Sequence, residues 1–190
     1  MKKDILIAGV GGQGILSLAF VLDNATMEAG FNFKQTEVHG MAQRGGGVVS
    51  HVRISDQAIH SDMIPMGMAD VILGIEPLEC LRYIKYLVPD GQLIVNSQPF
   101  INIPNYPELE KIQTAIKSYQ HTLLDAAALA KQAGHFHAQN MVLLGALSQS
   151  LPMEESLLLK WLKKLFIAKG EKVVNLNLDA FQLGKQAMHH

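Results

Sequence analysis

Short apolar runs alternate with segments of helical spacing along the first two thirds of the chain. Residues 5–8, Ile-Leu-Ile-Ala, are bounded by charge on one side and glycine on the other, a pattern typical of a buried parallel strand. Residues 15–29 repeat apolar side chains at helical spacing, and Gly30 can end that helix. Residues 31–38 and 48–54 predict two more strands. The chain therefore begins as strand, glycine loop, helix and two strands.

The same alternation continues through the middle of the chain. Residues 69–75 predict a buried strand, and Glu76-Pro77 predicts the start of a helix that runs to about Leu87. Pro89-Asp90-Gly91 has the composition of a turn. Residues 92–96 then predict the next strand.

Helical segments dominate the rest of the chain. We expect a helix over residues 108–118, a strand over 121–124 and an alanine-rich helix from Asp125. The helices after these are separated at Pro152 and Gly170. Strands that alternate with helices indicate an α/β fold: a single Rossmann-like, open, mostly parallel sheet with helices on both faces and a helical C-terminal part.

Composition narrows the class of partner. Hydrophobic residues make up 48% of the chain, charged residues 17%, and the net charge is -1. Neither nucleic acid nor an anionic membrane is therefore expected as the main partner. The apolar runs are too short for a membrane span and no signal peptide is evident, which predicts a cytoplasmic protein. No linker or repeat divides the sequence, so residues 1–190 are expected to form a single domain.

A glycine loop, Gly9-Val10-Gly11-Gly12-Gln13-Gly14, follows the first predicted strand and precedes the first predicted helix. That context matches the dinucleotide fingerprint, in which glycines allow close approach and the helix N-terminus attracts a phosphate. The fingerprint also needs an acidic residue at the end of the second strand, and Glu37 comes late and among polar neighbours. Two interpretations stay open: a standalone NAD(P)- or flavin-binding oxidoreductase, and a turn that binds nothing. The candidate residues are Gly11, Gly12, Gln13 and Gly14.

A second loop places an arginine among glycines, Gln43-Arg44-Gly45-Gly46-Gly47. The Arg44 guanidinium can pair with a carboxylate or phosphate with little steric obstruction. It can equally fix the loop to backbone carbonyls or to a partner chain. The candidates for ligand or subunit contact here are His39, Gln43, Arg44, Gly45 and Gly46, with Glu76, which can also cap its own helix.

The sequence offers little for a metal centre. His51, His135 and His137 lack the carboxylate or thiolate spacing of a metal site. Cys80 is the only cysteine, so the thiolates of this chain cannot hold an iron–sulfur cluster alone. We expect no metal ligand in this chain and assign Cys80 no role.

Six short motifs follow one another in a specific order. They are residues 9–14, 37–46, 52–54, 69–72, 76–79 and 140–146. Each motif by itself has little specificity for a family. Together they resemble the gamma-type subunit or domain of the 2-oxoacid:ferredoxin oxidoreductases, and most closely the small subunit of the indolepyruvate type.

The resemblance implies oxidative decarboxylation of a 2-oxoacid, indolepyruvate or another aryl pyruvate, to an acyl-CoA, with electrons passed to ferredoxin. In that family, thiamine diphosphate with Mg²⁺ and 4Fe-4S clusters carry the chemistry, and CoA is the cosubstrate. This chain has no Gly-Asp-Gly followed by a metal-binding Asn, so a larger partner subunit is expected to hold these groups. The chain itself is then an accessory subunit, inactive when isolated and able to pair as a homodimer. A purely structural subunit, whose glycine loops only accept the partner's backbone, is the remaining alternative.

Overall fold

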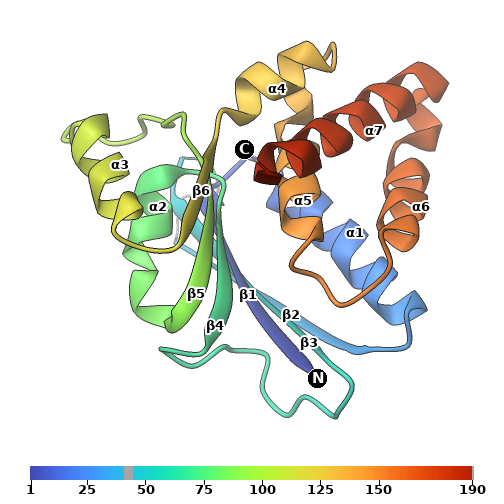
Figure 1. Ribbon diagram of the computed structural model, residues 1–190, viewed down its shortest axis with the longest axis horizontal. Helices are drawn as coiled ribbons and strands as arrows, with labels where there is room; N and C mark the ends of the chain where they lie inside the picture. Colours follow the sequence, from blue (N-terminus) through green and yellow to red (C-terminus); the bar gives the residue numbers. More distant parts are fainter. Residues whose placement is uncertain (41–44, 190) are drawn as a thin grey trace.

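The computed structural model, which describes residues 1–40 and 45–189, is built on one six-stranded sheet with the order β2-β3-β1-β4-β5-β6. Neighbours β1, β4, β5 and β6 are parallel, whereas β3 runs antiparallel to both β1 and β2. The predicted open, mostly parallel α/β sheet is thus confirmed (Figure 1). The strands are β1 Lys2–Val10, β2 Asn32–His39, β3 Gly47–Ser55, β4 Ala69–Gly74, β5 Leu87–Asn96 and β6 His121–Leu124.

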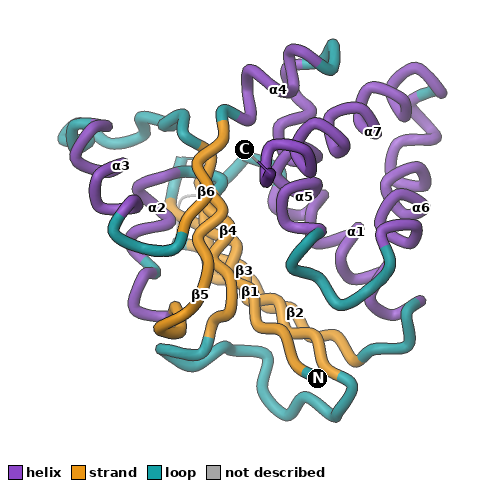
Figure 2. Tube along the Cα trace, in the orientation of Figure 1, coloured by secondary structure: helices purple, strands orange, loops and turns teal. Residues whose placement is uncertain are grey.

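Helices cover both faces of this sheet, as the sequence predicts (Figure 2). On one face lie α2 and α3; on the other lie α1 and the helices α4 to α7 (Figure 1). The helices are α1 Ile15–Glu28, α2 Pro77–Arg82, α3 Leu109–Lys117, α4 Ala126–Gln132, α5 Gln139–Ser148, α6 Glu155–Phe166 and α7 Glu171–Gln186. Short 3₁₀ turns are η1 Ile84–Tyr86, η2 Phe136–Ala138, η3 Ile167–Lys169 and η4 Ala187–His189. Within the described ranges, no helix is long and apolar enough to cross a membrane.

The apolar run of β1 is continuous because β1 is buried on both sides. Ile5 and Ile7 belong to the core that packs against α1 and α5. Leu6, between them, belongs to the second core, where Ile112 and Ile116 of α3 pack. Side chains alternate between the faces of a strand, so a central strand with two cores needs apolar residues at every position.

Two local predictions are wrong. The helix that begins at Pro77 ends at Arg82 instead of about Leu87, and η1 follows it. The predicted turn at residues 89–91 lies inside β5, where the pairing with β4 is irregular. Ala69 pairs with Leu87, but Val71 pairs with Gln92, so extra residues of β5 are accommodated as a bulge. Proline and glycine here mark an irregular strand instead of a turn.

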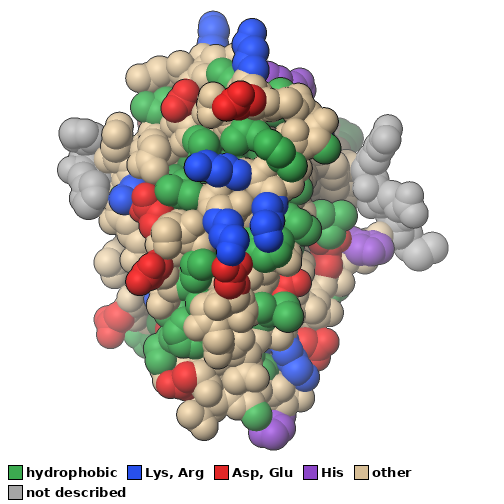
Figure 3. Space-filling view, turned by 90° about the vertical axis from the view of Figure 1, so that its right-hand side faces the viewer, with side chains coloured by type: hydrophobic (Ala, Val, Ile, Leu, Met, Phe, Trp, Pro, Cys, Tyr) green, Lys and Arg blue, Asp and Glu red, His purple; other side chains and the backbone are tan. Residues whose placement is uncertain are grey.

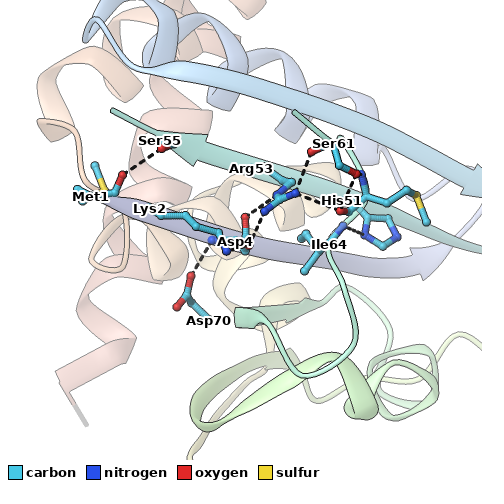
Figure 4. A network of polar contacts seen from close by, with 10 residues as sticks. Met1, Lys2, Asp4, His51, Arg53, Ser55, Ser61, Ile64 and Asp70 are labelled. Carbon is cyan, nitrogen blue, oxygen red and sulfur yellow. Dashed lines mark hydrogen bonds and ion pairs between the residues drawn. The ribbon is translucent and has the colours of Figure 1, made fainter. Parts of the chain in front are cut away.

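A network of polar contacts joins β1 and β3 to the loop that follows β3 (Figure 4). The Arg53 guanidinium donates to both carboxylate oxygens of buried Asp4, at 2.9 and 3.2 Å. The same group donates to the carbonyl oxygens of Ser61 (2.8 Å) and Met63 (3.2 Å). One arginine therefore ties the loop to β1 through a charge-assisted fork.

Candidate functional site

The carboxyl ends of β1, β4, β5 and β6 meet at one edge of the sheet, where ligands bind in open α/β sheets. A cleft of about 1110 Å³ opens there. It is lined by the glycine loop and the start of α1, by the end of β5 and the residues that follow β4, β5 and β6, and by parts of α4, η2, α5, α6, η3 and α7: Gly12, Gln13, Gly14, Ser17, Ile75, Asn96, Gln98, Pro99, Phe100, Asp125, Ala127, Ala128, Lys131, His135, Phe136, His137, Gln139, Asn140, Met141, Phe166, Lys169, Val173 and Asn177.

The glycine loop satisfies part of its own hydrogen bonding. The Gln13 side-chain oxygen accepts the Val10 backbone N–H at 2.7 Å, which folds the side chain back over the loop. Gly14 takes the left-handed conformation, φ 79°, as the N-cap of α1. No side chain caps α1, and its first turn contains no acidic residue. The loop thus offers a ligand backbone groups and not the Gln13 amide oxygen.

Asn140, at the start of α5, holds the loop from the other side. Its amide nitrogen donates to the carbonyl oxygens of Gln13 (2.7 Å) and Gly14 (3.1 Å). A Cβ atom at Gly14 would overlap with that amide, so glycine is needed there for close approach as well as for φ. Site reasoning missed Asn140, although one of the six motifs begins with it; the signal is a polar residue opening an apolar helix.

The second glycine loop lies against the first. The Gly11 N–H donates to the Gly46 carbonyl at 2.8 Å, and the Gly45 N–H donates to the Gly11 carbonyl at 3.3 Å. The Asn102 amide donates to the Gly45 carbonyl at 2.8 Å. The structure therefore brings Gly11, Gly45 and Gly46 together. Gln43 and Arg44 lie outside the described residues.

The cleft carries more cationic than anionic side chains. Lys131 and Lys169 are exposed along it, and neither forms an ion pair within the described part of the chain. Asp125 is committed to other contacts: it accepts the Ala128 N–H that starts α4 and the Gln98 amide, each at 2.8 Å. By contrast, lysines, acids and apolar side chains are interspersed on the outer face of α6 and α7 (Figure 3). The cleft is thus the better place for an anionic ligand.

Glu76 lies apart from the cleft lining and is 1% exposed. Its carboxylate accepts the Glu79 N–H at 2.8 Å and so caps α2. It also accepts the Phe100 N–H at 3.3 Å and the Tyr106 hydroxyl, which secures the loop after β5. Burial and this hydrogen bond raise the pKa of Tyr106. A ligand role for Glu76 stays a prediction.

A smaller depression of about 370 Å³ shares the glycine loop with the cleft. We call it the Glu37 pocket; it is lined by Val10, Gly11, Gly12, Gln13, Gly14, Ile15, Leu16, Glu37, His39 and Val48. The structure therefore places His39 beside the glycine loop. One carboxylate oxygen of Glu37, Oε2, is buried and has no hydrogen-bond partner within the described part of the chain.

The single thiol does not fit the chemistry of a cluster ligand. Cys80 is fully buried on α2, and burial raises the pKa of its thiol to about 12. A cluster ligand must be a thiolate, which this environment disfavours. Over residues 1–40 and 45–189, no group of three or more His, Cys, Asp or Glu side chains is placed to hold a metal ion.

Known proteins resemble this chain in sequence and in structure over almost its whole length. A family model described as pyruvate ferredoxin/flavodoxin oxidoreductase matches residues 4–187. The indolepyruvate oxidoreductase subunit IorB of Thermococcus kodakarensis is 38% identical, over 98% of this chain and 96% of that protein. The gamma subunit of a keto/oxoacid ferredoxin oxidoreductase from Geobacter sulfurreducens has a similar structure, with TM-score 0.72, 27% identity and 98% coverage of both chains.

A longer protein contains the same fold. The 2-oxoglutarate:ferredoxin oxidoreductase of Magnetococcus marinus, solved with 2-oxoglutarate, coenzyme A and succinyl-CoA bound, superposes with TM-score 0.79 at 23% identity. The match covers 99% of this chain and 31% of that one. At that identity the likeness concerns the fold alone, and it shows that the fold also occurs as one part of a larger polypeptide.

Proposed function

Because this chain belongs to the pyruvate ferredoxin/flavodoxin oxidoreductase family, we propose that it serves an enzyme that converts indolepyruvate, or another aryl pyruvate, to the acyl-CoA. The chain is a subunit of a 2-oxoacid:ferredoxin oxidoreductase, with ferredoxin as electron acceptor. The observation that carries the choice of 2-oxoacid is the 38% identity to an indolepyruvate oxidoreductase subunit over 98% of the chain.

We assign thiamine diphosphate, Mg²⁺ and the 4Fe-4S clusters to a larger partner subunit. The buried, protonated Cys80 supports this division, since a cluster needs several accessible thiolates. Decarboxylation and electron transfer to ferredoxin then occur on the partner. The contribution of this chain is to cover the shared active site, exclude water from it and help position substrates.

The cleft at the carboxyl edge is our proposed contact with CoA. Phosphate groups need cations and free N–H donors, and the cleft presents Lys131, Lys169 and the loop at the start of α1. CoA is bound in the Magnetococcus enzyme, which has the same fold. The sequence-based proposal for Arg44, that it meets a carboxylate or phosphate beside this site, is retained.

The reconstituted two-subunit enzyme tests these assignments. It should reduce ferredoxin with indolepyruvate and CoA, and failure with every aryl pyruvate would refute the choice of substrate.

The double variant Lys131→Ala/Lys169→Ala should raise the KM for CoA about tenfold, roughly 1.4 kcal/mol, and leave the KM for the 2-oxoacid unchanged. Lys163→Ala, an exposed lysine of α6 outside the cleft lining, is the matched control. Equal KM values for CoA in all three enzymes would contradict the CoA assignment, and unchanged kinetics of Arg44→Ala would contradict the role of Arg44.

A further inference from the structure

The carboxylate oxygen Oε2 of Glu37 accepts no hydrogen bond from any residue in the described part of the chain. Glu37 lies on the edge strand β2 opposite Ser50 of β3. Ser50 Oγ accepts a hydrogen bond from the Gln35 amide at 2.9 Å, and the Ser50 hydroxyl is not within hydrogen-bond distance of the buried Oε2 of Glu37. Oε2 of Glu37 is therefore a buried acceptor left without a donor within the described residues, which costs free energy until a donor arrives. The missing donor is expected where Glu37 borders open space, in the Glu37 pocket.

The lining of the pocket favours a cation over an anion. Among its described residues Glu37 is the acid, and none is lysine or arginine. The large cleft, in contrast, presents Lys131 and Lys169 to an anion. The position of β2 also departs from the dinucleotide unit, because antiparallel β3 lies between β1 and β2 and sets them two strand spacings apart, roughly 10 Å.

An apolar stripe begins at the rim of this pocket. Leu16, which lines the pocket, is 70% exposed, and Phe20 and Met27 of the same helix are 39% and 64% exposed. With 3.6 residues per turn, these three positions share one side of α1. Phe20 is held edge-on against Trp161 of α6, with ring centroids 6.1 Å apart. Exposed apolar side chains that form a continuous stripe mark a protein contact.

The charge on α1 has one sign. The helix contains no lysine or arginine, and Asp23 lies on the same side as the stripe. At the α6 border of the stripe, Glu28 pairs with Lys160, and the Lys164 ammonium lies 3.8 Å from the centroid of the Trp161 ring. Asp23 and Glu37 form no ion pair within the described residues, so the pocket and the side of α1 that bears Asp23 are apolar and acidic. A two-fold contact between copies of this chain would set this acidic surface against itself, so a basic partner surface complements it better than a second copy does.

We propose that the α1 stripe and the Glu37 pocket form the docking surface for the larger subunit, a basic side chain of which enters the pocket and pairs with Glu37. Apolar side chains around that basic residue cover Leu16, Phe20 and Met27 and keep water from the ion pair. The inference rests on the proposed function for the existence of the larger subunit and adds the face by which it is held.

Co-expressed complexes test the proposal by mass photometry over a dilution series, which gives the apparent Kd of the two subunits. Glu37→Gln keeps the shape and removes the charge, and Leu16→Ser removes the apolar rim. Each should weaken assembly at least about tenfold. Controls are Glu110→Gln on α3 and Ile167→Ser in η3, exposed residues away from this surface, and both should stay within about twofold of wild type.

Thermal unfolding of the isolated chain separates docking from a structural role. Glu37→Gln should unfold at the same or a higher temperature than wild type, because Oε2 of Glu37 is a buried acceptor without a partner and the amide adds an N–H donor in its place. Weaker assembly combined with unchanged or greater stability supports the proposal. A lower unfolding temperature would make Glu37 a structural residue and overturn it.

If something other than the larger subunit binds the α1 stripe and the Glu37 pocket, the same measurements give a different result. Unchanged assembly of Glu37→Gln overturns the proposal, and if the KM for CoA rises instead, the pocket takes a small molecule. If the variants alter only the dimerisation of the isolated chain, the surface belongs to a second copy, and the proposal fails. A wild-type complex that assembles but turns over no aryl pyruvate would refute the substrate assignment, while the Kd values would still decide the docking surface.

Discussion

Single buried or half-buried polar side chains determine how the loops of this molecule are held. Asn140 donates to two carbonyls of the glycine loop, and Arg53 to two carbonyls of the loop after β3. His51 adds a third contact of this kind: its Nδ1 accepts the Ile64 N–H at 3.1 Å, and the residue is 1% exposed. An imidazole nitrogen can accept that bond only while it is unprotonated.

His51 should make stability depend on pH. Burial, with a smaller effect of Arg53, lowers the pKa of His51 below its usual 6.5, although Asp62 acts in the opposite direction. The unfolded chain therefore binds more protons than the folded chain once the pH falls below about 6.5, and stability decreases toward the folded pKa. The slope contributed by this group is at most ~1.4 kcal/mol per pH unit.

Urea unfolding at several pH values measures this effect. We expect His51→Asn, whose amide oxygen can still accept the Ile64 N–H, to remove part of the acid sensitivity. His60→Gln, an exposed histidine in the same loop, should leave the slope unchanged. Equal slopes for wild type and His51→Asn would show that His51 does not titrate on unfolding.

Sequence reasoning at this scale identified residue types better than their contacts. The glycines of both loops are predicted site residues, and the structure joins Gly11 to Gly45 and Gly46 by backbone hydrogen bonds that a sequence cannot display. Glu37 was given little weight because it comes late in its strand, yet it lines the pocket beside the loop. Contacts such as Asn140 with Gln13, 127 residues apart, depend on the tertiary fold.

At the scale of elements, the existence of strands was predictable and their order was not. β-branched and apolar runs predicted β4 and β6 closely, whereas β1 extends beyond the predicted residues 5–8 at both ends. The insertion of antiparallel β3 between β1 and β2 was not foreseen, because such runs reveal a strand but not its neighbour. The short connection 40–46 was the available signal, since only antiparallel strands can be joined so briefly.

The crossing of α5 and α7 depends on two glycines inside helices. A Cβ atom at Gly145 would overlap with the Phe181 carbonyl, and one at Gly184 with the Val142 carbonyl. The two backbones therefore approach too closely for any side chain at these positions. Gly184→Ala should lower the free energy of unfolding by about 2 kcal/mol or more, despite the better helix propensity of alanine.

Chemical denaturation measures that loss against a control on the same helix. Asn175→Ala changes an exposed position of α7, so it should leave stability unchanged or raise it slightly. If Gly184→Ala were as stable as Asn175→Ala, the close crossing of the two helices would not exist in solution.

At the scale of the whole molecule, what matters is how the chemistry is divided between chains. The fold supplies an edge with a cationic cleft, a glycine loop and an acidic pocket, but its one thiol is buried in the core beneath Gly74. This arrangement supports the proposal that the chain contributes surfaces and that the partner holds the redox centres. The sequence already favours that division, because it contains one cysteine and no Gly-Asp-Gly followed by a metal-binding Asn.

The division has a direct spectroscopic consequence. The isolated chain should show no visible absorption and should not reduce an acceptor when given indolepyruvate and CoA, whereas the complex with its larger subunit should do both. Cys80→Ala provides the sharper comparison: because a buried thiol with a raised pKa is not a cluster ligand, the variant complex should keep the full cluster absorbance of wild type. Any loss of stability in this variant, expected to be about 1 kcal/mol from the small volume removed, would appear in the unfolding midpoint and not in the spectrum. A coloured isolated chain, or a Cys80→Ala complex with less iron per mole of protein, would place part of the redox centre on this subunit.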